Sequence, residues 1–148
     1  MLTIDASEAI AALNAMAMRI ADAEPVLAAI GYAEVEVIRA RIEEGKKSPQ
    51  GEEWAPWRPW TESERKKKGN TARGLLWDSG NLMDSIRSEV SANGVIIGTD
   101  IEYGPELQRG RGPGDPYPME ARPFVGWDEQ GKVHAEMLMV HHIQGFAS

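Results

Sequence analysis

The chain has 148 residues, of which 42% are hydrophobic and 26% are charged, and its formal net charge is −7 at neutral pH. This size and composition are typical of one globular domain, and they argue against a disordered or fibrous chain. The acidic balance disfavours a protein whose main task is to neutralise phosphates, because DNA affinity comes from clustered lysines and arginines. Since the chain contains no cysteine, disulfides, thiolate metal sites and thiol nucleophiles are excluded.

The sequence shows no sign of export or of membrane insertion. No apolar run approaches the roughly 20 residues that are needed to span a bilayer. Asp5 and Glu8 stand where a signal peptide would carry its basic and apolar regions. We therefore expect a protein that is made in the cytoplasm and has no membrane partner.

The N-terminal part of the chain predicts a helix over residues 5–22, with Asp5 or Ser7 as its cap. Residues 1–4 alternate weakly and are either a short strand or the frayed start of this helix. The apolar positions recur at spacings of three and four, which is one face of an amphipathic helix. They are Ile10, Leu13, Met16, Ala17 and Ile20.

A second helix is predicted to begin at Pro25, whose missing N–H has no partner in a first helical turn, and to end at Gly45. Its apolar face is wide, so we expect this helix to lie across a sheet or between partners. The face carries Val26, Ile30, Ala33 and Val37, and it is widened by Val35, Ile38 and Ile42.

Residues 46–75 predict a long loop, which we interpret as an extended arm. Proline and glycine recur throughout this segment, which also carries Trp54, Trp57 and Trp60. A loop of this length is usually either a binding element or disordered, and three tryptophans argue against a merely solvated linker. The tryptophans either pack in the core or clamp a partner. A row interrupted by Pro56 and Pro59 cannot be one regular helix face, which keeps the loop clamp open beside core packing.

The next segment predicts a short helical turn and a β-hairpin. Asp78 or Ser79 is expected to cap a turn that runs through Leu82, followed by a strand over residues 85–90. Asn93 and Gly94 favour a type I′ turn, because both central positions of that turn need positive φ values. A compact strand of β-branched residues follows at 95–98.

The C-terminal third predicts a brief helix at residues 103–108, a Gly/Pro loop at 110–118 and a last amphipathic helix after Trp127. One side of the last helix carries the apolar residues Val133, Met137 and Val140 and, one turn later, Gln144. Together the elements predict an α+β fold in a single domain over residues 1–148. In it, two N-terminal helices pack on a small antiparallel β-sheet, with a long Pro/Gly/Trp loop and a C-terminal helix.

No pattern in the sequence indicates catalysis, a metal or a cofactor. His134 precedes His141 and His142 by seven and eight residues. That spacing is two helical turns, about 11 Å, which is too far for one metal ion to bind both ends, so a surface or interface role is favoured. The Gly-rich stretch 110–114 lacks the Gly-Lys-Ser/Thr ending of a phosphate-binding loop, and no Gly-x-Ser-x-Gly elbow is present. We therefore predict a protein that is not an enzyme and holds no cofactor.

Several short segments carry recognisable patterns in a particular order. Residues 49–56 form a Pro-x-Gly-x-x-Trp-x-Pro loop, and residues 75–86 read Leu-Leu-Trp-Asp-Ser-Gly-Asn-Leu-Met-Asp-Ser-Ile. Residues 95–99 are Val-Ile-Ile-Gly-Thr, and Tyr103 is followed by Gln108 and Gly110. Residues 121–126 are Ala-Arg-Pro-Phe-Val-Gly.

In this order and spacing, the segments resemble the phage virion morphogenesis family, the tail completion proteins of Mu-like and P2-like contractile phages. Two departures stand out: Gly104 and Pro105 follow Tyr103 where an alanine and a helix are more usual, and Glu120 replaces a proline. The resemblance implies a structural protein of a bacteriophage that completes the tail and helps to join it to the head. It further implies a homo-oligomeric ring, a hexamer, at the neck of the virion, assembled in the host cytoplasm.

The partners implied are other copies of the chain, head-tail connector or portal-proximal neck proteins, and tail tube or tail terminator proteins, with DNA only passing through the channel.

In the Arg122-Pro123-Phe124 turn, we expect Arg122 to make a bidentate contact and Phe124 to fill a core or interface pocket. We also expect Trp54 and Trp57 to matter more for assembly than for folding. The predicted interface residues are Trp54, Trp57, Trp60, Tyr103, Gln108, Arg122 and Phe124.

A second hypothesis is a nucleic-acid-binding accessory protein. In it, a basic run would contact DNA while the three tryptophans of the arm offer stacking platforms. The same run could instead contact an acidic partner or simply form a solvated surface. It consists of Arg65, Lys66, Lys67 and Lys68. A third hypothesis, a small hydrolase, lacks a recognisable catalytic motif.

Overall fold

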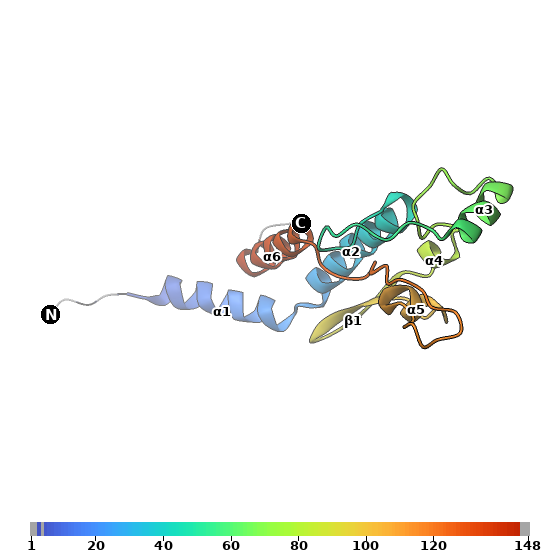
Figure 1. Cartoon of the computed structure of the whole chain (residues 1–148). Helices are drawn as coiled ribbons and strands as arrows, with labels where there is room; N and C mark the ends of the chain where they lie inside the picture. Colours follow the sequence, from blue (N-terminus) through green and yellow to red (C-terminus); the bar gives the residue numbers. More distant parts are fainter. Residues whose placement is uncertain (1–2, 4, 146–148) are drawn as a thin grey trace.

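The computed structural model describes Thr3 and residues 5–145, and it confirms the predicted α+β class (Figure 1). Residues 1–4, predicted as a strand or as the start of a helix, lie outside the described residues except for Thr3. The elements in chain order are α1 (Ser7–Ala21), α2 (Glu24–Glu44), α3 (Pro59–Lys68), α4 (Asn81–Asp84), β1 (Arg87–Ser91), β2 (Gly94–Gly98), α5 (Gly104–Arg109) and α6 (Glu129–Gln144).

Helix α2 is the central element, and it packs against the β1–β2 hairpin, α4 and α6. Its predicted boundaries are confirmed: Pro25 lies in the first turn, and Gly45 follows the last helical residue in an extended conformation. The buried side of α2 differs in detail from the prediction, because Val37 is exposed and Glu34 is buried instead. The core around α2 comprises Val35, Ile38, Ile42, Trp54, Leu76, Leu82, Ile86 and Phe124.

Helix α1 is present as predicted, but it does not pack on the sheet. It projects away from the body, and its C-terminal end leans on α6 through a hydrogen bond of 2.9 Å from Arg19 Nη1 to the carbonyl of Ile143. None of its residues is buried. The predicted caps are also wrong, since Ala6 is the N-cap and Asp5 instead accepts a hydrogen bond from the Ser7 N–H at 2.9 Å.

The hairpin forms where it was predicted, with a different turn. Strands β1 and β2 are antiparallel and pair Ser91 with Gly94, so Ala92 and Asn93 form the two-residue connection. The type I′ prediction is wrong, because no residue other than glycine has a positive φ in the described part of the chain. Gly94 begins β2 and is therefore not a central turn residue.

The predicted 46–75 loop contains helix α3, which the sequence analysis missed. Pro59 occupies the first turn of α3, and Gly69 ends it with a positive φ of 73°. These two residues bracket a helix, because a proline fits the first helical turn and a glycine adopts the left-handed cap without strain. Upstream of α3, Lys47 and Glu53 form an isolated antiparallel bridge.

Helix α6 starts as predicted after Trp127, with Asp128 as its N-cap accepting from the Gly131 N–H at 2.7 Å. Its predicted apolar side does not pack on the core, since Val133, Met137 and Val140 are exposed. The side of α6 that faces α2 is the one that carries Gly131, Ala135 and Leu138. No helix within residues 5–145 is long and apolar enough to cross a membrane.

The contact of α2 with the hairpin leaves no room at Gly31. A Cβ atom there would lie 2.8 Å from Val95 Cγ2 and 2.9 Å from Ser88 Oγ. We predict that Gly31→Ala lowers the free energy of unfolding by about 1–3 kcal/mol, even though alanine is the better helix former. Urea unfolding measures the change, with Gly114→Ala as the control, since nothing lies within 4 Å of the Gly114 position. A Gly31→Ala protein as stable as the wild type would contradict this packing.

The carboxyl group of Glu34 lies buried between α2 and α6, and its Oε1 atom has no hydrogen-bond partner among the described residues. Burial raises the pKa of Glu34, a rise that the charge of Arg41 opposes and that of Asp128 increases. A raised pKa means that the folded chain binds more protons than the unfolded chain, so stability falls as the pH rises from about 4.5 through the raised pKa.

We predict that Glu34→Gln removes the fall in stability that ionisation of Glu34 causes as the pH rises. The variant should therefore be more stable than the wild type at neutral pH. Urea unfolding of both proteins across this range isolates the effect, because the other carboxylates cancel in the difference. A difference between the two proteins that does not change with pH would contradict the prediction.

Candidate assembly interface

Two loop segments that are distant in the sequence are bound together at the centre of the molecule. The Trp54 indole donates to the carbonyl of Pro123 at 3.0 Å. The Arg122 guanidinium donates through Nε to the carbonyl of Ala55 at 3.0 Å and through Nη2 to that of Pro56 at 2.9 Å. The predicted bidentate contact of Arg122 is thereby confirmed, with backbone carbonyls as its acceptors.

Gln108 at the end of α5 holds the same turn from the other side. Its Oε1 accepts from the N–H groups of Phe124 at 3.0 Å and Val125 at 3.1 Å, and its Nε2 donates to the Val125 carbonyl at 3.0 Å. Phe124 is 1% exposed and lies in the core, which is one of its two predicted positions. Helix α5 forms despite Gly104 and Pro105, because proline is tolerated in a first helical turn.

Arg41 on α2 adds a third connection that sequence reasoning missed. Its Nη1 donates to the carbonyl of Phe124 at 2.7 Å, and its Nη2 lies 3.3 Å from the Asp128 carboxylate that caps α6. The only sequence signal was the position of an arginine between Ile38 and Ile42 on the apolar face of a predicted helix.

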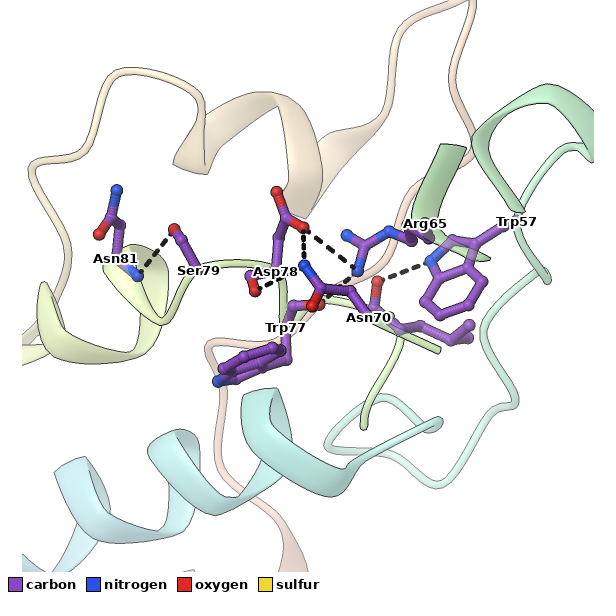
Figure 2. Close-up of polar contacts among 8 residues, drawn as sticks. Trp57, Arg65, Asn70, Trp77, Asp78, Ser79 and Asn81 are labelled. Atoms are coloured by element: carbon purple, nitrogen blue, oxygen red, sulfur yellow. Dashed lines mark hydrogen bonds and ion pairs between the residues drawn. The ribbon is translucent and has the colours of Figure 1, made fainter. Parts of the chain in front are cut away.

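Helix α3 is fastened to the segment that precedes α4 (Figure 2). The Trp57 indole donates to the Leu75 carbonyl at 2.9 Å, and the Arg65 guanidinium lies over the Trp57 ring, 4.6 Å from its centroid. Arg65 also donates to the carbonyl of Trp77 and lies 4.0 Å from the Asp78 carboxylate. Burial lowers the pKa of Arg65, with the charge of Asp78 opposing the shift.

These contacts contradict part of the nucleic-acid hypothesis. Trp54 is in the core, the Trp57 ring is covered by Arg65, and Trp60 is exposed, so the three tryptophans form no row of stacking platforms. The Arg65 guanidinium points inward. Lys66 and Lys67 pair with Glu62 at 2.7 Å and Glu64 at 2.6 Å, respectively. Contact of Lys66, Lys67 and Lys68 with DNA or an acidic partner stays a prediction.

A groove of about 790 Å³ opens between α3, the segment 75–83 and the loop 110–120. Its aromatic lining includes Trp60 and Tyr117, which are 75% and 73% exposed, and Tyr103, which is 42% exposed. Burial raises the pKa of Tyr103, and the charge of Asp78 adds to this rise. The charged residues of the lining are Arg58, Arg65, Arg111, Arg122, Asp78 and Glu120, so the arginines outnumber the carboxylates by two.

The predicted interface residues therefore fall into two groups. Trp54, Arg122 and Phe124 are buried, and Trp57 and Gln108 bind backbone groups of their own chain. The expectation that Trp54 matters more for assembly than for folding is contradicted by its position in the core, because a side chain buried there has no surface left for a partner. Trp60 and Tyr103 line the groove, where an interface role stays a prediction.

A comparison with protein-family models matches residues 4–144 to the phage virion morphogenesis family. The chain belongs to the phage virion morphogenesis family. It is therefore a structural protein of phage assembly and is associated with the virion. The chain gives no significant match to a curated protein or to a solved structure.

Sequence reasoning did not single out Tyr117, Arg58 or Arg111, which complete the groove of this family member. Tyr117 carried one signal, as an aromatic residue inside a Gly/Pro loop. Of the three histidines, His142 has its Nε2 atom 2.7 Å from the Asp22 carbonyl at the end of α1. Within the described residues, no group of three or more His, Cys, Asp or Glu side chains could hold a metal ion.

The Arg122 contact predicts a specific stability loss. Lysine keeps the positive charge but offers no planar pair of donors, so Arg122→Lys leaves the Ala55 or Pro56 carbonyl without its partner. We expect Arg122→Lys to lower the free energy of unfolding by about 1.5–3 kcal/mol. Phe124→Ala, which removes a core side chain, should lower it by about 3–5 kcal/mol. Thermal or urea unfolding of both variants measures these losses. Arg58→Lys is the control, because its exposed pair with Glu120 contributes little. An Arg122→Lys protein with unchanged stability would show that the bidentate contact does not hold the loops.

Proposed function

We propose that this protein completes the phage tail and helps to join it to the head, as one subunit of a homo-oligomeric ring at the neck. The observation that carries the proposal is membership of the phage virion morphogenesis family over residues 4–144. The resemblance of residues 48–130 to tail completion proteins supports this stage of assembly. A hexamer is the ring size that the resemblance implies.

The surface of the single chain supports a protein that works between neighbours. Eleven of the 15 residues of α1 are Ala, Ile, Leu or Met, yet none of its residues is buried. Such a helix is unfavourable in water unless other surfaces cover it. The outer side of α6 and the groove beside α3 are further exposed apolar surfaces. A subunit that is enclosed by a ring and by the proteins above and below it would bury such surfaces.

The acidic charge is compatible with a channel through which DNA passes. With a net charge of −7, a ring of such subunits would not hold the phosphate backbone strongly. We propose that the head-side partners are connector or portal-proximal neck proteins and that the tail-side partners are tail tube or tail terminator proteins. DNA is then a passing molecule and not a ligand.

Electron microscopy of phage that lack this protein tests the proposal. We expect filled heads separate from tails, and tails that are unjoined or over-long, with joined particles restored by the wild-type chain supplied in trans. Labelled protein should lie at the junction of head and tail in the restored particles. Normal joined particles in the absence of the protein would rule out a role in tail completion.

A further inference from the structure

We infer that the projecting helix α1 of one subunit docks in the groove of the next subunit, between α3 and the loop 110–120. This contact rests on the proposed ring and specifies how its subunits are joined. The groove is formed by residues of α3, the segment 75–83 and the loop 110–120.

Helix α1 has the surface of a helix that is meant to be covered. Ile10, Leu13, Met18 and Ile20 are each more than half exposed. Its contacts with its own chain are at the C-terminal end, where Arg19 and Asp22 meet α6. The apolar N-terminal half extends from the body without support (Figure 1). A helix that is apolar on most of its sides is normally buried against other protein.

The groove offers an apolar surface of matching character. Trp60 on α3 and Tyr117 on the loop 110–120 line it and are exposed, and the half-buried Met83 and Met119 also line it. Aromatic and methionine side chains are enriched where proteins bind one another. Aromatic side chains present a large apolar area with few rotatable bonds, and methionine side chains are flexible enough to adapt to the shape of a partner.

The charges of the two surfaces are complementary. Residues 5–18, which include the projecting half of α1, carry Asp5 and Glu8 and no cationic side chain. The groove lining has four arginines against two carboxylates, and two of the arginines, Arg65 and Arg122, bind backbone carbonyls of their own chain. The exposed side of α6, a second apolar surface, carries Glu129, Lys132 and Glu136, so its carboxylates outnumber its lysine. Charge therefore favours the groove over α6 as the site of α1.

The arrangement of the two surfaces implies a chain of subunits and not a symmetric pair. Helix α1 projects at one end of the molecule, and α3, which lines the groove, lies at the opposite end, so the projecting half of α1 cannot fill the groove of its own chain (Figure 1). A contact between two different surfaces is heterologous, and it closes into a ring when the rotation between neighbours is suitable. A contact between two α1 helices would end at a dimer.

Cross-linking tests the contact directly, because the chain contains no cysteine. Ala9 is exposed on α1, and Thr61 lines the groove on α3. The Ala9→Cys/Thr61→Cys protein is treated with a short bismaleimide, both in purified phage particles and as concentrated purified protein. We expect a ladder of covalent species beyond the dimer, and no ladder from either single variant.

Three results would overturn the docking. Dimers from Ala9→Cys alone would place two α1 helices together. A ladder from Ala9→Cys/Met137→Cys, with none from Ala9→Cys/Thr61→Cys, would place α1 on α6. The third result is the absence of any cross-link in both samples. If joined particles contain the double variant but yield no ladder, the docking fails while the role in tail completion stands. If phage without the protein are normal, the proposed function itself fails.

A matched pair of tyrosines provides a second measurement. Tyr117 lines the groove and is 73% exposed, whereas Tyr32 is 71% exposed on α2 outside it. Neither side chain supports the core, so both alanine variants should melt like the wild type. We expect Tyr117→Ala to reduce the yield of joined particles at least tenfold and Tyr32→Ala to leave it unchanged. Equal yields from the two variants would exclude the groove as the docking site.

Discussion

The centre of this molecule depends on the hydrogen bonds that the Arg122 guanidinium donates. It binds the carbonyls of Ala55 and Pro56, while the Trp54 indole binds the Pro123 carbonyl in return. Both segments lack regular secondary structure, so their buried backbone groups cannot be satisfied by a helix or a sheet. Side chains supply the missing partners, and a core made partly of loops becomes stable because of them.

Helix α2 connects this centre to the rest of the fold. Its apolar side covers the hairpin, and Arg41 reaches the Phe124 carbonyl and the carboxylate that caps α6. The loop contacts and the position of α6 are therefore coupled through one side chain. Glu34 lies beside Arg41 and Asp128, and burial is what raises its pKa at that position.

The molecule thus combines a well-connected body with surfaces that have no partner in the single chain. The body holds α3 in place through the Trp57 and Arg65 contacts, which keeps one wall of the groove in a defined position. Helix α1, by contrast, is held at one end. A preformed groove and a projecting helix suit an assembly subunit, because a rigid receptor loses little entropy on binding. A rigid groove and a projecting helix on one chain are also consistent with its membership of a family of virion assembly proteins.

The sequence by itself determined the α+β class, the extent of α2 from Pro25 to Gly45, the two hairpin strands and the family. Those features depend on local periodicity, on residues that begin or end helices, and on the order of short motifs. The bidentate role of Arg122 was also predictable, because Pro123 restrains the backbone before it. Only the tertiary structure decided that Trp54 is buried while Trp60 is exposed, that Arg65 points inward, and that α3 interrupts the predicted loop. It also decided that α1 and one side of α6 stay uncovered. The physical reason is that a periodic pattern shows which face of a helix is apolar, whereas the position of every other segment determines whether that face meets its own chain or a neighbour.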